Sequence, residues 1–110
     1  YFREYKFEPS DRPVVLSEFG GYSLKFPGHT YSLKRNYGYG NTSSCDELSD
    51  KIIALYEREI VPAIKKGLCA SIYTQITDVE EETNGLYTYD RKVCKVNITK
   101  FKELSKKLRL

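Results

Sequence analysis

The order of hydrophobic and polar positions predicts a strand, a long loop, a helix, a second strand and a final helix. Residues 14–17 form a short, continuously apolar run, which is typical of a parallel strand buried on both faces. Residues 20–44 follow as a loop, because glycines and a proline interrupt every period. A second apolar and partly β-branched run over residues 68–76 predicts the other strand.

The segment between the loop and the second strand has a clear helical pattern. Ser44, three residues before Glu47, forms a capping box. Pro62 predicts a bend or a local loosening near residues 58–62, and Gly67 ends the helix. Apolar residues recur at three- and four-residue steps, at Leu48, Ile52, Leu55, Tyr56, Ile60, Ala63 and Ile64.

A strand, a helix and a second strand in this order predict a right-handed βαβ unit with parallel strands. Residues 96–110 add a closing helix, with Phe101, Leu104 and Leu108 on one face. The expected fold class is therefore α/β.

Composition excludes several classes of partner. The chain is 40% hydrophobic and 30% charged, and it contains no apolar run near the roughly 20 residues of a membrane span, so we expect a soluble protein without a membrane partner. Residues 91–110 hold eight Lys or Arg and one acid, and the chain has ten tyrosines, a combination that can bind nucleic acid. These lysines also fit the outer face and last turns of an amphipathic helix, so no nucleic-acid partner is expected.

Cys45, Cys69 and Cys94 are odd in number and include no closely spaced pair of the zinc-binding type. We expect structural thiols, and neither a metal nor another cofactor. An odd count favours a reducing, cytoplasmic compartment, and a secreted enzyme with buried cysteines is the alternative.

Glu18 closes the first apolar run and is followed by Phe19, Gly20 and Gly21. A buried strand cannot bury a charged group at its end, so this side chain should emerge at a sheet edge or a cleft. The two glycines allow a sharp turn or the close approach of a ligand. Glu18 is therefore a candidate catalytic residue; the alternative is that it begins a solvated loop.

Two further polar residues are candidates for substrate contacts. Asp78 follows the second strand, and the carboxyl ends of parallel strands meet at one edge, so we expect Asp78 and Glu18 to face one cleft. The acids at Asp78 and 80–82 lack the alternating spacing of a calcium loop, which favours a solvated or substrate-contacting loop. His29, the single histidine, either contacts a hydroxyl group of the substrate or tunes Glu18, or it faces solvent.

Residues 13–20, and Ser17 to Gly20 above all, resemble the seventh-strand signature of glycoside hydrolase family 2, the clan of β-galactosidases, β-glucuronidases and β-mannosidases. The likeness continues through Tyr22 and, more diffusely, through residues 73–86, which are similar to the eighth strand and the following loop of the same barrel. The resemblance implies that Glu18 is the catalytic nucleophile. It also implies that residues 1–110 are the C-terminal βαβα portion of a (β/α)8 TIM barrel, from the seventh strand to the eighth helix.

A complete barrel needs roughly 250 residues. This chain has 110, begins with Tyr1 and contains no methionine, so we expect a fragment of a longer protein. In the family the acid/base is a glutamate preceded by asparagine, and no asparagine precedes a glutamate here. The acid/base is therefore expected in the upstream barrel, and the fragment alone is expected to be inactive.

The family's eighth strand commonly carries a tryptophan that forms the floor of the sugar subsite. This chain has Thr74 at that position and no tryptophan at all. The apolar face of a sugar ring still needs an aromatic platform, which would come from Tyr73, from elsewhere or from the aromatic residues of the long loop: Tyr22, Phe26, His29, Tyr31, Tyr37 and Tyr39. The expected substrate contacts are Tyr22, His29, Tyr73 and Asp78.

The expected function is retaining hydrolysis of β-linked sugars, with the carbohydrate substrate and the remaining barrel as partners. The alternative is a non-catalytic carbohydrate-binding or assembly module with a degenerate glycosidase fold, which Thr74 favours. Parallel strands with unpaired edges also predict that the isolated chain self-associates.

Overall fold

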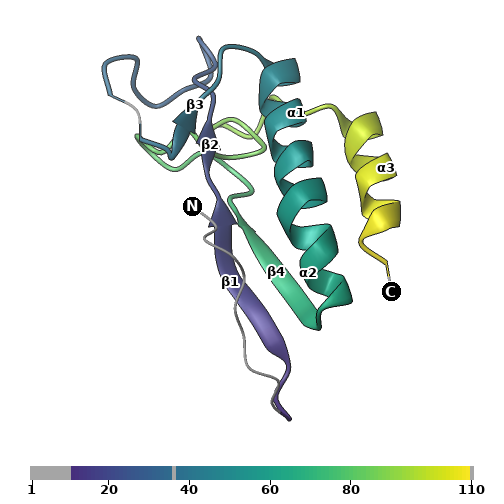
Figure 1. The fold of residues 1–110 in the computed structure, drawn as a ribbon. Coiled ribbons are helices and arrows are strands. Elements are labelled where there is room, and N and C mark those ends of the chain that lie inside the picture. Colours follow the sequence, from purple (N-terminus) through teal and green to yellow (C-terminus); the bar gives the residue numbers. More distant parts are fainter. Residues whose placement is uncertain (1–10, 36, 110) are drawn as a thin grey trace.

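The computed structural model describes residues 11–35 and 37–109 as a small parallel sheet with helices packed against it (Figure 1). This arrangement confirms the α/β class expected from the sequence. In chain order the elements are β1 (Val14–Gly20), β2 (Tyr22–Ser23), β3 (Gly40–Asn41), α1 (Cys45–Leu55), the π-helical turn η1 (Tyr56–Ile60), α2 (Val61–Lys65), β4 (Leu68–Thr74) and α3 (Ile98–Lys107).

Strands β1 and β4 form a parallel pair, as the βαβ pattern predicts. Phe19 lies opposite Tyr73 in this pair, and the residues that follow each of them are also opposite each other. Parallel strands need a long crossover connection, which α1, η1 and α2 supply. Strand β1 is longer than expected, because it continues through Glu18 to Gly20.

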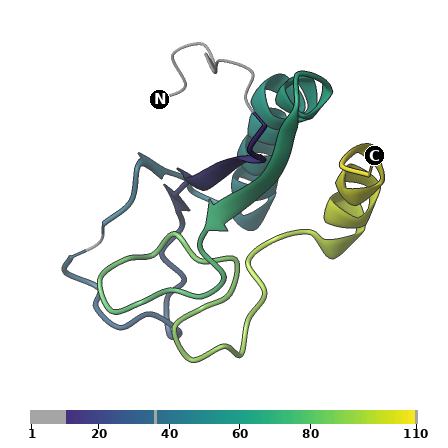
Figure 2. The same ribbon diagram turned by 90° about the horizontal axis from the view of Figure 1, so that it is seen from below.

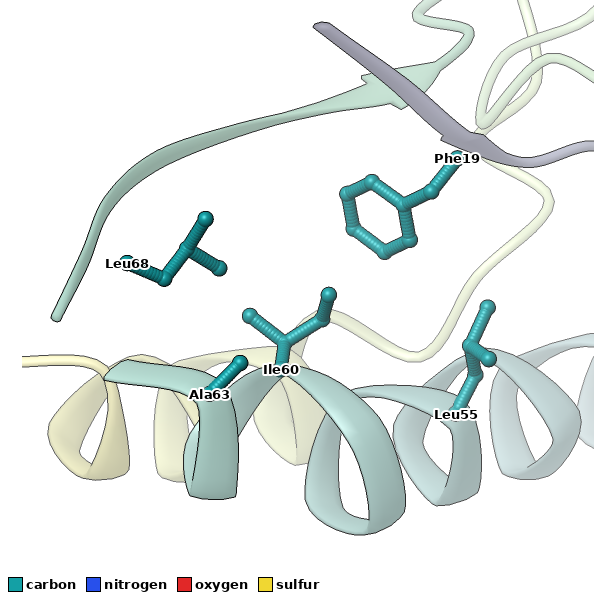
Figure 3. Close-up of a cluster of buried hydrophobic side chains, with 5 residues drawn as sticks. All are labelled: Phe19, Leu55, Ile60, Ala63 and Leu68. Atoms are coloured by element: carbon teal, nitrogen blue, oxygen red, sulfur yellow. The ribbon is translucent and has the colours of Figure 1, made fainter. Parts of the chain in front are cut away.

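The expectation that β1 is buried on both faces is wrong for this chain. Val15 in β1 is 50% exposed and Ile72 in β4 is 57% exposed. The reason is that the core packs on one side of the sheet, between the strands and the helices (Figure 3). The other face is left with exposed apolar side chains.

The helical segment over residues 45–65 begins and loosens where the sequence predicts. The Ser44 Oγ accepts a hydrogen bond from the Glu47 N–H at 3.1 Å, and the Glu47 carboxylate accepts one from the Ser43 N–H at 2.7 Å. The π-helical turn η1 ends two residues before Pro62, which lacks an N–H and whose ring clashes with the carbonyl of Arg58 in a regular α-helix. The wider turn is the expected physical response to this proline.

Two clusters of buried side chains hold the helices on the sheet. The first joins the strands to the crossover helix and consists of Phe19, Leu55, Ile60, Ala63 and Leu68 (Figure 3). The second lies nearer the loops and consists of Leu24, Leu48, Ile52 and Val96. Helix α3, capped by Asn97 and burying Leu104, packs beside α1 as the closing helix.

The loops that follow β1 and β4 gather beyond the carboxyl ends of these strands (Figure 2). The predicted loop 20–44 contains two short strands, β2 and β3, which pair in parallel. It is joined to the loop after β4 by the hydrogen bond from the Leu24 N–H to the Thr83 carbonyl, at 2.9 Å. Among the described residues, no helix has the length and apolar character to cross a membrane.

Candidate functional site

A cavity of about 450 Å³ lies at the carboxyl end of β1. Glu18 is exposed and contributes to its lining, so the expectation that this carboxylate emerges at a cleft is confirmed. Thr74, at the carboxyl end of β4, lines the same cavity and is followed by a cis peptide bond to Gln75. The described residues that line it are Glu18, Phe19, Gly20, Tyr22, Tyr39, Leu55 and Thr74.

Gly20 and Gly21 bring two tyrosine rings against the end of β1. Their φ angles are +93° and +88°, in the left-handed region that favours glycine. A Cβ on Gly20 would lie 2.2 Å from the ring of Tyr73, and one on Gly21 would lie 2.4 Å from the ring of Tyr39. The close approach that these glycines permit is therefore made by side chains of the same chain.

Tyr73, expected to contact the substrate, lies in the core instead of lining the cavity. Its ring packs edge-on against Phe19, with 5.5 Å between the ring centres, and parallel to Tyr56 at 6.3 Å. Its hydroxyl is buried and has no hydrogen-bond partner within the described residues. Burial raises the pKa of this hydroxyl, and the nearby N–H of Gly21 opposes the shift only in part.

Asp78 does not face the cleft with Glu18, and this part of the expectation is wrong. Its side chain is 1% exposed, and its Oδ1 accepts hydrogen bonds from Lys95 Nζ at 2.6 Å and from the Gly85 N–H at 2.8 Å. Burial raises the pKa of Asp78, and the Lys95 ammonium offsets part of that rise. Asp78, which was expected in a solvated or sugar-contacting loop, is therefore one half of a buried ion pair.

Lys95 connects the loop after β1 with the loop after β4 through hydrogen bonds. Its side chain is fully buried, and its Nζ donates to the carbonyl oxygens of Leu24 and Thr83, each at 2.9 Å, as well as to Asp78. Leu24 belongs to the loop after β1, whereas Thr83 and Asp78 belong to the loop after β4. Lys95 does not stand out in the sequence, because one lysine among the basic residues of 91–110 shows no local sign of burial.

His29 is likewise engaged away from the cavity. Its Nδ1 lies 2.7 Å from Asp90 Oδ2, and its ring packs against Phe26 with centres 5.8 Å apart. The hydroxyl of Thr88 and, next, His29 hold the pKa of Asp90 well below its usual range. His29 neither lines the cavity nor simply faces solvent, so the structure gives it a role in joining two loops.

Two tyrosines, Tyr22 and Tyr39, are among the described residues that line the cavity. Tyr22 was expected at the site and is half-buried, whereas Tyr39 is 59% exposed. The neighbouring Tyr37 and, after it, the negative charge of Glu18 raise the pKa of Tyr39. The alternation of tyrosine and glycine over residues 37–40 is the local pattern that could have indicated an exposed aromatic pair.

The described residues that line the cavity offer one carboxylate, together with aromatic rings and hydroxyl groups. Glu18 is the one acid among the described lining residues, whereas retaining glycoside hydrolysis uses two carboxyl groups about 5–5.5 Å apart. The described residues contain no cluster of three or more potential metal ligands, and the three cysteines are free thiols.

Comparison of the chain with protein-family models gives no match, and comparison with curated proteins gives none either.

Proposed function

We propose that this chain forms the C-terminal part of the catalytic barrel of a retaining glycoside hydrolase of the family 2 type, which acts on β-linked sugars. Glu18 is the nucleophile in this proposal. The observation that carries it is the exposed Glu18 carboxylate in a cavity at the end of β1, next to the end of the parallel strand β4. Ligands of β/α barrels bind at this end of the strands.

The proposed reaction assigns one chemical role to this chain. Glu18 attacks the anomeric carbon and forms a glycosyl ester while an acid protonates the departing glycosidic oxygen. Water then hydrolyses the ester, with the same acid acting as a base, so the sugar keeps its β configuration. The acid/base comes from the remaining barrel, because Glu18 is the single carboxylate of the described cavity lining.

The uncovered face of the sheet supports the barrel arrangement. Val15 and Ile72 are about half exposed on strands that pack against the helices with their opposite face. In a β/α barrel the face of the sheet turned away from the helices is filled by side chains from the other strands. The remaining strands of the proposed barrel would bury these two side chains.

A second candidate function is a non-catalytic carbohydrate-binding module. The observation that favours it is Thr74, which lines the cavity where the resemblance places an aromatic platform. Such a module would bind β-linked sugars through the same cavity but would form no covalent intermediate at Glu18.

The test is chemical rescue in the complete protein to which, under this proposal, the chain belongs. Glu18→Ala removes the nucleophile, so hydrolysis of an aryl β-glycoside with a good leaving group should fall by at least about a thousandfold. Added azide should fill the vacated space and restore turnover, giving a glycosyl azide of α configuration. Wild-type activity in the Glu18→Ala variant, or no hydrolysis by the wild-type protein, would overturn the proposal. Binding of sugars without hydrolysis would instead favour the module.

A further inference from the structure

The cavity beside Glu18 has an exposed aromatic wall. Of the aromatic residues in its described lining, Phe19 is buried at 6% exposure and Tyr22 is half-buried, whereas Tyr39 is 59% exposed. Tyr73 packs in the core instead of lining the cavity, and Thr74 offers no ring. Tyr39 is therefore the described lining residue that can present an aromatic face to a ligand.

The backbone fixes the position of Tyr39. Its N–H donates to the Gly21 carbonyl at 2.8 Å, and its ring comes within 2.4 Å of the place that a Cβ on Gly21 would take. Tyr37, two residues earlier, is held from the other side, since its N–H donates to the Glu81 carbonyl at 2.7 Å. The two loops beyond the strands thus hold this segment between them.

The rings of Tyr37 and Tyr39 support each other. Their centres lie 5.9 Å apart with 70° between the ring planes, an edge-to-face arrangement that leaves both side chains more than half exposed. Rings that are held by the backbone and by each other lose little conformational entropy when a ligand binds. A second exposed pair, Tyr31 and Tyr89 at 5.4 Å, lies away from the cavity lining.

We propose that Tyr39, braced by Tyr37, is the aromatic platform of the sugar subsite next to Glu18, in place of the tryptophan that this chain lacks. The inference rests on the proposed function and names its substrate class: a β-linked hexopyranose unit whose C–H face lies on the Tyr39 ring. A tyrosine hydroxyl can also donate a hydrogen bond to a hydroxyl group of the sugar.

The experiment measures sugar affinity in the complete protein, on a Glu18→Gln background so that no substrate is consumed. The probes are the methyl β-glycosides of glucose, galactose, mannose and glucuronic acid. Their binding is measured by saturation-transfer NMR and calorimetry. Tyr39→Leu keeps an apolar side chain without an aromatic face, and Tyr39→Phe keeps the ring without the hydroxyl. Tyr89→Leu is the matched control, since Tyr89 is an exposed tyrosine in a comparable pair.

Tyr39→Leu should weaken binding of the best probe by about three- to tenfold, while Tyr39→Phe stays within about threefold of the parent and Tyr89→Leu does not change it. Equal affinity of Tyr39→Leu and its parent, an equal loss in Tyr89→Leu, or no binding of any probe would overturn the platform. Azide rescue of Glu18→Ala reports on the nucleophile separately. If azide restores turnover in Glu18→Ala but Tyr39→Leu binds sugar as tightly as its parent, the platform alone is refuted. If Tyr39→Leu binds sugar more weakly but azide does not restore turnover in Glu18→Ala, the nucleophile alone is refuted.

Discussion

Asp78 and Lys95 form a buried ion pair, with 2.6 Å between Oδ1 and Nζ and side chains that are 1% and 0% exposed. The pair joins the loop after β4 to the segment that precedes α3, and Lys95 extends the connection to the loop after β1 through the Leu24 carbonyl. A buried charge without its partner is costly, so each member of the pair depends on the other.

Lys95→Met should lower the free energy of unfolding by about 3–5 kcal/mol, because it leaves the Asp78 carboxylate buried and unpaired. The double variant Asp78→Leu/Lys95→Met should lose less than the sum of its single substitutions. Urea unfolding of the four proteins in this cycle measures the coupling. Lys106→Met, in the exposed pair with Glu103, is the control and should cost at most about 1 kcal/mol. Additive losses at Asp78 and Lys95 would contradict the account of the pair.

Glu47 should make the stability of the chain depend on pH in the acid range. Hydrogen bonds from the Ser43 hydroxyl and N–H, and then from Lys51, lower the pKa of Glu47 from 4.5 to about 2 in the folded state. A lowered folded pKa stabilises the fold above the unfolded value, and this stabilisation is lost as the pH falls from about 4.5 to about 2.

Thermal unfolding of wild type and Glu47→Gln from pH 7 to pH 2 tests this. The variant should melt at a lower temperature at pH 7, and the two curves should converge near pH 2. Glu80→Gln, which replaces an exposed acid on the loop after β4, serves as the comparison. A constant difference between wild type and Glu47→Gln over the whole range would rule out the assigned role of the carboxylate.

Gly20→Ala and Gly28→Ala should differ in cost, although both glycines have positive φ angles, +93° and +82°. A Cβ at Gly20 meets the Tyr73 ring at 2.2 Å, whereas a Cβ at Gly28 meets nothing within 4 Å. We expect losses of about 2–5 kcal/mol at Gly20 and about 1 kcal/mol at Gly28, measured by urea unfolding. Similar losses at the two positions would show that the contact with Tyr73 is unimportant.

The isolated chain should self-associate through the uncovered face of its sheet. Val15 and Ile72 are 50% and 57% exposed there, and parallel sheets are normally covered on both faces. Val15→Lys/Ile72→Lys should shift sedimentation towards the monomer. Leu33→Lys, at a 68% exposed loop position, should leave the association unchanged. A stable wild-type monomer would count against this prediction.

The sequence predicts those parts of the fold that depend on local interactions. The capping box of Ser44 and Glu47 and the helical spacing after it needed no tertiary information, and Pro62 marked the loosened turn within a few residues. The parallel pairing of β1 with β4 followed from the order of the elements.

The burial of individual side chains in the loops was harder to predict. Asp78 stands beside three other acids in the sequence, and its partner Lys95 is 17 residues away, so no local pattern distinguishes it from a solvated group. Tyr73 was expected to face a sugar, but its register opposite Phe19 turns the ring into the core. Tyr39 was one of several tyrosines in a long loop, and only the hydrogen bond to Gly21 places it beside Glu18.

The central claim is that Glu18 is a catalytic nucleophile. The most direct measurement is to incubate the complete protein with a 2-deoxy-2-fluoro-β-glycosyl fluoride, which traps the glycosyl ester, and to locate the label by peptide mass spectrometry. The account predicts a single label on Glu18, with loss of activity in step with labelling. A label on a different residue, or hydrolysis that proceeds without any covalent intermediate, would contradict it.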